Sequence, residues 1–345
     1  MTIVEAGRPI TGGVDTHRDV HVAAALDPLG GLLGVESFET TPIGYRSLVL
    51  WLSSFGNLTR VGVEGTGAYG AGLARFLRRA GVEVIEVDRP NRQARRHQGK
   101  SDGADAVEAA RAVLSGRASG VAKTRDGQVE AIRTLLVAKR SARDARIRAL
   151  NQIRHLSFTG PDELRARLKG LSSAAVAAKA ARLRARRGDP VVFATTVSLA
   201  TLGRRVLALD DETTRIDELL GELVATTAPN LLEIYGVGVD TAAVLLVTAG
   251  DNPERLRSEA AFAHLCGVSP VPASSGKVQR NRLNRGGDRQ ANQALWRIVM
   301  TRMSFDPRTR AYVDRRTKEG RSKREVIRIL KRYVVREVYR QLPRA

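Results

Sequence analysis

Cysteine and aromatic residues are scarce in this 345-residue chain, which has one cysteine, Cys266, and only 4% aromatic side chains. A single thiol cannot form an intrachain disulfide, so a disulfide-stapled scaffold is excluded and a reducing compartment is expected. The sequence also lacks an uninterrupted apolar run of about 18 residues and the basic start, apolar run and cleavage site of a signal peptide. We therefore expect a soluble intracellular protein of two or three domains.

Acidic residues are few relative to basic ones: 36 Asp and Glu stand against 57 Lys and Arg, which gives a net charge of +21. The excess is segregated, because residues 123–187 carry +12 and residues 277–345 carry +15, whereas residues 1–122 carry +1 and residues 188–276 carry −7. This distribution favours a polyanionic partner, nucleic acid before a membrane surface. Since aromatics are rare, widespread base stacking is excluded, and we expect four of them in the core or on helix faces: Trp296, Tyr312, Tyr333 and Tyr339.

The N-terminal third has the pattern of a mixed α/β sheet. Residues 12–27 suit a strand that turns or bulges and continues, and a second strand follows. The order strand, strand, helix, strand, helix, strand predicts the sheet. A basic loop then leads into a helix that begins near Ser101 or Asp102, and Ser101 suits an N-cap.

The rest of the chain is predicted to be mainly α-helical. Residues 128–156 and 161–187 combine Ala, Leu and Arg in a narrow apolar stripe, which predicts an extended helical hairpin or coiled coil. A long helix is expected from about Ala194 to Ala225, followed by a Gly-Val-Gly turn and a second apolar helix. This pair is either a helix-hairpin-helix element, whose amides near Gly236 and Gly238 hold a backbone phosphate, or an ordinary core helix pair.

Four carboxylates stand out by context. Asp15 in GGVDTHRDV and Glu64 in VGVEGTG lie at or near the ends of short apolar runs, and Asp102 and Asp105 lie three apart on the expected helix. If they converge they repel one another, and two hard divalent ions about 4 Å apart would compensate that charge and could clamp a phosphodiester. Taken singly, each residue also fits a structural role as a turn, strand end, helix cap or solvated position.

His17 and His21 lie close to Asp15 in the sequence. We do not expect them to be transition-metal ligands, because no cysteine cluster accompanies them and the neighbouring carboxylates favour Mg²⁺ or Mn²⁺.

A Pro- and Gly-rich loop near the C-terminus carries Ser274 and Ser275, followed within fifteen residues by five cations. Nearby cations could stabilise both a phosphoryl transition state and a serine-linked phosphodiester. The alternative is a turn that binds phosphate without covalent chemistry.

These segments together resemble the Piv-like DEDD transposases of insertion-sequence family 110. The resemblance runs through GVDTHRDVHV, VGVEGTGAYG, KSDGADAVEAARA, YGVGVDTAAVLL, the SSGK loop and RLNRGGDRQAN. It implies an RNase-H-like, RuvC-type DEDD domain over residues 1–122 and a coiled-coil segment over 123–225 for RNA binding and oligomerisation. A mainly α C-terminal transposase domain with the serine nucleophile would occupy residues 226–345.

The resemblance also implies residue roles. The DEDD set falls on Asp15, Glu64, Asp102 and Asp105, which would hold Mg²⁺ or Mn²⁺, and the serine that directly precedes a glycine is Ser275, with Ser274 as the alternate. Nucleic-acid contacts are expected from Arg92, Arg95, Arg96, Lys100, Lys277, Arg280, Arg282, Arg285 and Arg289, together with Gly236 and Gly238.

The implied activity is cleavage and rejoining of target and donor DNA, guided by a structured non-coding bridge RNA from the element itself. Because strand exchange needs several cuts, a homodimer or tetramer is expected in the cytoplasm, associated with the nucleoid. Two rival hypotheses remain. One is a RuvC-like nuclease or junction resolvase without a covalent intermediate, and the other is a non-catalytic architectural protein with structural carboxylates.

Overall fold

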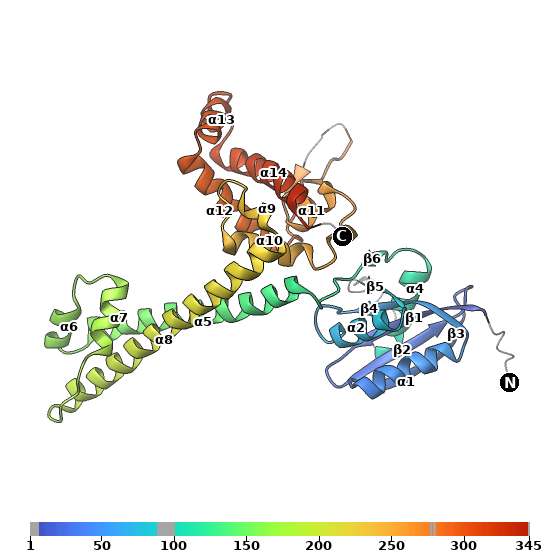
Figure 1. Cartoon of the computed structure of the whole chain (residues 1–345), viewed down its shortest axis with the longest axis horizontal. Helices are drawn as coiled ribbons and strands as arrows, with labels where there is room; N and C mark the ends of the chain where they lie inside the picture. Colours follow the sequence, from blue (N-terminus) through green and yellow to red (C-terminus); the bar gives the residue numbers. More distant parts are fainter. Residues whose placement is uncertain (1–6, 88–100, 277, 279–280, 344–345) are drawn as a thin grey trace. The chain divides into compact units, whose positions relative to one another are not determined.

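The computed structural model describes residues 7–87, 101–276, 278 and 281–343 (Figure 1). The chain forms two compact units. The first lies within Met1–Gly127 and takes in Gly250–Arg257, and the second comprises Gln128–Ala249 and Ser258–Pro343.

The first unit is built on a mixed sheet, as predicted. Its strands are β1 (Pro9–Thr16), β2 (Val20–Leu26), β3 (Leu32–Glu39), β4 (Asn57–Glu64), β5 (Glu83–Val87) and β6 (Gly120–Val121). They lie in the order β3-β2-β1-β4-β5-β6. Strands β1, β4 and β5 run parallel, while β2 and β6 pair antiparallel with β1 and β5, and β3 with β2.

The segment 12–27 differs from the prediction of one continuing strand. The His17 amide donates to the Val20 carbonyl at 3.2 Å, which closes a tight turn, and Thr16 then pairs with His21. The chain therefore reverses direction and forms a hairpin, so three strands precede the first helix instead of two.

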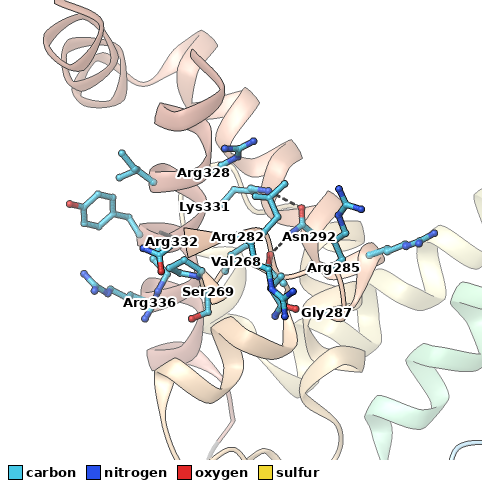
Figure 2. Close-up of a pocket in the computed structure, with 18 residues that line it drawn as sticks. Val268, Ser269, Arg282, Arg285, Gly287, Asn292, Arg328, Lys331, Arg332 and Arg336 are labelled. Carbon is cyan, nitrogen blue, oxygen red and sulfur yellow. Dashed lines mark hydrogen bonds between the residues drawn. The ribbon is translucent and has the colours of Figure 1, made fainter. Parts of the chain in front are cut away.

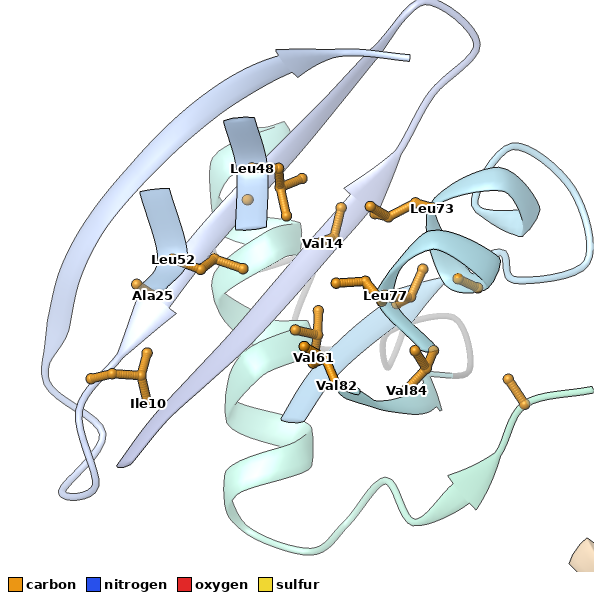
Figure 3. Packing of buried hydrophobic residues seen from close by; sticks show 14 residues of the cluster. Ile10, Val14, Ala25, Leu48, Leu52, Val61, Leu73, Leu77, Val82 and Val84 are labelled. Atoms are coloured by element: carbon orange, nitrogen blue, oxygen red, sulfur yellow. The ribbon is translucent and has the colours of Figure 1, made fainter. Parts of the chain in front are cut away.

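The two faces of the sheet are covered by different helices. Helices α1 (Pro42–Ser53) and α2 (Ala71–Arg79) pack on one face, where Leu48, Leu52, Leu73 and Leu77 are fully buried (Figure 3). Helix α4 (Asp102–Leu114) lies behind the strands in this view and covers the other face through its alanines and Val113. The alternation of side chains along each strand separates these two cores.

The second unit contains a long antiparallel helix pair, α5 (Gln128–Thr159) and α8 (Pro190–Thr227). The basic side chain of Lys139 pairs with Asp217, and that of Arg146 pairs with Asp210. The prediction that residues 161–187 form the second arm is wrong. That stretch forms two short helices, α6 (Asp162–Leu168) and α7 (Ser173–Ala181), because Gly170 with φ +73° and a serine N-cap interrupt it.

The remainder of this unit is a bundle of shorter helices. They are α9 (Pro229–Leu232), α10 (Val239–Ala249), α11 (Glu259–Leu265), α12 (Arg289–Phe305), α13 (Pro307–Lys318) and α14 (Lys323–Gln341). Two short strands, β7 (Val271–Pro272) and β8 (Asn281–Arg282), form a hairpin between α11 and α12, and a short 3-10 helix (Pro253–Arg255) lies in the first unit.

Among the described residues, α8 is the one helix long and apolar enough to cross a membrane by length and mean hydropathy alone. It packs along α5 and α7. A single such helix is weak support for a membrane span, since helices packed within soluble proteins share these properties.

Candidate active site

Two of the predicted carboxylates lie at the ends of adjacent parallel strands. Val14 of β1 is in register with Val63 of β4, so Asp15 and Glu64 are the next residues on neighbouring strands. The Thr16 hydroxyl donates to the Glu64 carbonyl at 2.8 Å and ties the two strand ends together. Asp15 is buried and Glu64 is half-buried.

Glycines two residues earlier on each strand let helix α4 approach this part of the sheet. A Cβ on Gly13 would lie 2.3 Å from the Ala106 carbonyl oxygen, and a Cβ on Gly62 would lie 2.8 Å from that of Ala109. Residues two apart on a strand point to the same face, so each carboxylate follows its glycine on the α4 side of the sheet. The repeated Gly-Val-acid pattern thus serves both close packing and the placement of charge.

Helix α4 brings the other two carboxylates to the same edge. Ser101 is its N-cap, as predicted, and its hydroxyl accepts from the Ala104 amide at 3.3 Å. Asp102 and Asp105 both lie in the first turn, where the helix dipole favours negative charge. Asp105 is buried, whereas half of the Asp102 side chain is exposed.

His17 lies between carboxylates from two elements. Its Nε2 atom is 3.2 Å from Asp15 Oδ2 and 3.4 Å from Asp102 Oδ1, in the geometry of an ion pair and not of a well-aligned hydrogen bond. The sequence analysis did not expect His17 to take part in the site. Its position two residues after Asp15, in the turn that closes the β1–β2 hairpin, could have indicated that the two side chains lie close together. One ligand atom from each of Asp15, His17 and Asp102 lies within 4.8 Å of the others.

Burial raises the pKa of Asp15 above its ordinary value. The charge of His17 lowers that pKa, and the charges of Asp105 and Asp102 raise it. The structure therefore brings three of the four predicted carboxylates into electrostatic contact, with Glu64 at the adjacent strand end.

His21 lies on the opposite face of the sheet from Asp15. It is fully buried and its ring stacks on Tyr45 of α1, with ring centroids 5.7 Å apart. Burial lowers the pKa of His21, which favours the neutral imidazole at this core position. The sheet therefore separates His21 from the carboxylate cluster.

The carboxylate cluster fits a divalent cation. Carboxylate oxygens are the donors that Mg²⁺ and Mn²⁺ prefer, and a cation would compensate the repulsion that raises the pKa of Asp15. The buried Nε2 of His17 faces the same space and adds one nitrogen donor, which Mn²⁺ accepts more readily than Mg²⁺.

The two serines lie at the end of the β7–β8 hairpin. The Ser275 amide donates to the Val278 carbonyl at 3.2 Å and the Val278 amide to the Ser275 carbonyl at 3.1 Å, across a turn in which Gly276 has φ +53°. Both Ser274 and Ser275 are exposed.

The predicted nucleic-acid contacts fall into two groups. Arg282, Arg285 and Arg289 line a cavity of about 700 Å³ at the base of the serine hairpin (Figure 2). The others, Arg92, Arg95, Arg96, Lys100, Lys277 and Arg280, lie outside the described residues.

A close backbone contact holds the base of the hairpin. A Cβ on Gly287 would lie 2.3 Å from the Gly267 Cα, and the Asp288 amide donates to the Leu265 carbonyl at 2.7 Å. Asp288 is also the N-cap of α12, so the Gly-Gly-Asp segment of the sequence has a structural role.

The Gly-Val-Gly turn precedes α10 and is also held locally. Gly236 has φ +80°, and the Arg302 guanidinium donates to the Tyr235 carbonyl at 2.9 Å. The Gly238 amide donates to the Thr241 hydroxyl at 3.0 Å, so this amide already has a partner. The helix before the turn, α9, has only four residues.

The strand order, the carboxylates gathered at one sheet edge and the helical second unit define a class of protein. They are consistent with an RNase-H-like α/β unit that carries a candidate divalent-metal site and is joined to a mainly helical unit.

Comparisons with known proteins agree with this class. Residues 12–158 match a family model described as a transposase (DEDD_Tnp_IS110), and residues 228–314 match the model of the transposase IS116/IS110/IS902 family. The chain belongs to the IS110 family of DEDD transposases.

Two curated relatives are similar over part of their length. The insertion element IS110 uncharacterized 43.6 kDa protein of Streptomyces coelicolor is 34% identical over 116 residues, which is 33% of this chain and 28% of that protein. The insertion element IS900 uncharacterized 42 kDa protein of Mycobacterium paratuberculosis is 29% identical over 137 residues, or 39% and 34% of the two chains. The chain thus spans about a third or less of each relative.

Proposed function

We propose that this protein is an insertion-sequence transposase that cuts and rejoins DNA through a carboxylate metal site and a serine nucleophile. The observation that carries the proposal is the meeting of Asp15 and Asp102, 87 positions apart in the sequence, on either side of the His17 imidazole. Such a cluster of like charges is unfavourable without a cation and is the donor set that phosphodiester chemistry uses. Family membership supports the same activity.

Asp15, Glu64, Asp102 and Asp105 would hold Mg²⁺ or Mn²⁺, with His17 beside them. Such a cation, when bound, activates an attacking oxygen and stabilises the charge on a phosphate. The protein itself supplies the positions of these groups, because β1, β4 and α4 are fixed by close packing at Gly13 and Gly62.

Ser275 is the proposed nucleophile, with Ser274 as the alternate. Its Oγ would form a bond to a DNA phosphorus as one P–O bond to a deoxyribose breaks. The serine proton leaves, and the released sugar oxygen takes up a proton. The phosphoester energy is kept, so a hydroxyl of another strand can attack the serine-linked phosphate and restore the serine. Arg282, Arg285 and Arg289 would stabilise the charge on phosphate near the hairpin base.

The basic segments would bind target DNA, donor DNA and a bridge RNA from the element. Phosphate contacts would come from the predicted cations of residues 92–100 and 277–289. They would also come from the turn at Gly236 and Gly238, where the Gly238 amide would exchange the Thr241 hydroxyl for a phosphate oxygen. In this division of roles base pairing selects the sequence, while the protein reads backbone and shape.

We further propose three domains at residues 1–122, 123–225 and 226–345, and a homodimer or tetramer formed through the long helix pair. α8 exposes Val191, Val197 and Leu219, which supports a contact of this kind. Localisation would be cytoplasmic, at the nucleoid.

The decisive experiment combines purified protein, the RNA of the element end, target and donor DNA, and Mg²⁺. We expect a covalent protein–DNA adduct and recombinant junctions with the wild type. The adduct should disappear in Ser275→Ala, and both products should disappear in Asp102→Ala. Asp19→Asn, an exposed carboxylate outside the cluster, serves as the matched control and should behave as wild type.

Each alternative has its own outcome. An adduct that persists in Ser275→Ala but vanishes in Ser274→Ala moves the nucleophile by one residue. Metal-dependent nicking without any adduct supports a RuvC-like nuclease. Recombination that proceeds equally without RNA removes the guide from the proposal.

A further inference from the structure

A face of helix α14 contributes cations to the cavity at the base of the serine hairpin, beyond residue 314 where the family match ends. Arg328, Lys331, Arg332 and Arg336 share this face of the helix, and the loops around β7 and β8 lie opposite (Figure 2). The serine hairpin therefore begins at the edge of the cavity.

All the charged side chains that line the cavity are basic. Its lining contains six arginines and one lysine and no Asp or Glu. Outside the lining, Glu259 pairs with both Arg332 and Arg336. Like charges four residues apart on a helix destabilise it, so their accumulation here favours an anionic ligand.

The wall of the cavity is also apolar. Val268, Leu283 and Ile329 line it, together with Tyr333, and the side chains of Leu283 and Tyr333 are 54% and 46% exposed. The sequence predicted Tyr333 in the core or on a helix face, and not as a stacking platform. It is on a helix face, and its ring is accessible from the cavity. A volume of about 700 Å³ lies within the range that holds small organic ligands.

A hydrogen-bond network prepares the cavity for binding. The Lys331 ammonium donates to Asn292 Oδ1 at 2.8 Å, and Asn292 Nδ2 donates to the carbonyls of Cys266 and Gly267 at 3.1 and 3.0 Å. Both side chains are therefore held in place before any ligand arrives. Burial lowers the pKa of Lys331, with the charge of Arg328 acting in the same direction.

We propose that this cavity holds one unpaired nucleotide of a nucleic-acid strand, with its phosphates on the cations and its base against Leu283 and Tyr333. A paired and stacked base cannot enter such a cavity, so single-stranded or locally opened substrate is required. The proposal rests on the proposed function to the extent that this strand is the recombination substrate. The chain between the cavity lining and Ser275 is five extended residues long and spans about 17 Å at most. The nucleotide in the cavity would therefore flank the phosphate that Ser275 attacks.

The test measures binding of the full-length protein to an unstructured 12-nucleotide thymidylate strand, the same strand with one central abasic site, a uridylate strand and a 12-base-pair duplex. Arg285→Gln combined with Arg328→Gln removes two exposed cations, and Arg324→Gln on the same helix is the matched control. We expect the double variant to bind thymidylate about tenfold more weakly, with the salt slope reduced by roughly 1.4. The control should change less than twofold.

Base recognition is tested by a cycle of protein and strand changes. The abasic site should weaken binding to the wild-type protein about fivefold or more. In Leu283→Ala or Tyr333→Ala the same abasic site should weaken binding less than twofold. Leu283→Ala keeps the test valid if loss of the Tyr312–Tyr333 ring contact unfolds the other variant. The proposal would be overturned if the abasic site weakened binding equally in wild type and Leu283→Ala. It would also be overturned if the double arginine variant bound thymidylate as tightly as wild type.

The remaining measurements distinguish RNA from DNA as the source of the nucleotide, and the cavity proposal from the proposed function. Tighter binding of uridylate than thymidylate assigns the nucleotide to RNA, and the reverse assigns it to DNA. Loss of the serine adduct with the cavity behaviour intact refutes the proposed function alone. Normal adduct formation with no cavity dependence refutes the cavity proposal alone.

Discussion

Gly13 of β1 and Ala110 of α4 are in backbone contact: a Cβ on Gly13 would lie 2.2 Å from the Ala110 amide nitrogen. This contact sets the distance between the sheet and the helix that carries Asp102 and Asp105. The geometry of the candidate metal site therefore depends on the absence of one methyl group in the core.

Gly13→Ala should destabilise the first unit, because the added methyl group overlaps backbone atoms that cannot rotate away. We expect a loss of about 3 kcal/mol in the free energy of unfolding, at the upper end for overpacked cores, measured by chemical denaturation. Gly221→Ala in α8 is the contrast: nothing lies within 4 Å of its Cβ position, so this change should stabilise its helix by up to about 1 kcal/mol. A Gly13→Ala protein as stable as wild type would contradict the close packing.

Divalent metal should stabilise the first unit against heat. A ligand present at 100 times its Kd stabilises a fold by about 2.7 kcal/mol, so millimolar Mn²⁺ or Mg²⁺ should raise Tm by several degrees relative to EDTA. Asp15→Asn should remove most of this increase. Asp19→Asn, whose carboxylate is 87% exposed, should keep it, and equal metal-induced shifts in both variants would argue against the site.

His21 should make the stability of the first unit sensitive to acid. Burial lowers its folded-state pKa below the unfolded value of about 6.5, so between these values the unfolded state binds more protons. The stability is fully present above the unfolded-state pKa of about 6.5 and is lost progressively as pH falls from there to the lower folded-state pKa. His21→Phe keeps the stacking on Tyr45 and should flatten the decline in unfolding free energy between pH 7 and 5. The exposed His155→Gln is the control and should leave the decline as it is.

Lys139 joins three helices of the second unit. Its ammonium pairs with Asp217 of α8 and Asp240 of α10, and only 15% of its side chain is exposed. Burial by itself lowers the pKa of Lys139, but the hydrogen bonds and charges of Asp217 and Asp240 raise it, and together they favour the charged ammonium. Lys139→Met should lower the unfolding free energy by about 1–3 kcal/mol because two carboxylates lose their partner. Lys179→Met, at an exposed position, should cost less than about 0.5 kcal/mol.

Local sequence patterns were sufficient for several features. Alternation and helical periodicity predicted the mixed sheet and its helices, and Ser101 was recognised as the N-cap of α4 because capping depends on residues only three positions apart. Two predictions from these patterns were wrong: that one strand continues through residues 17–19, and that residues 161–187 pair with α5. Both depend on which segments meet in space, and a periodic stripe does not specify its partner.

The sequence by itself determined the family, the charge distribution and the identities of the four carboxylates and the two serines, because these are properties of residue type and order. Only the tertiary structure decided that His17 lies between Asp15 and Asp102, that His21 faces the other core, and that α14 faces the base of the serine hairpin. These relationships arise from packing between distant segments. Gly13 and Gly62 admit α4, and Gly267 and Gly287 bring the loops together, through contacts that no short stretch of sequence encodes.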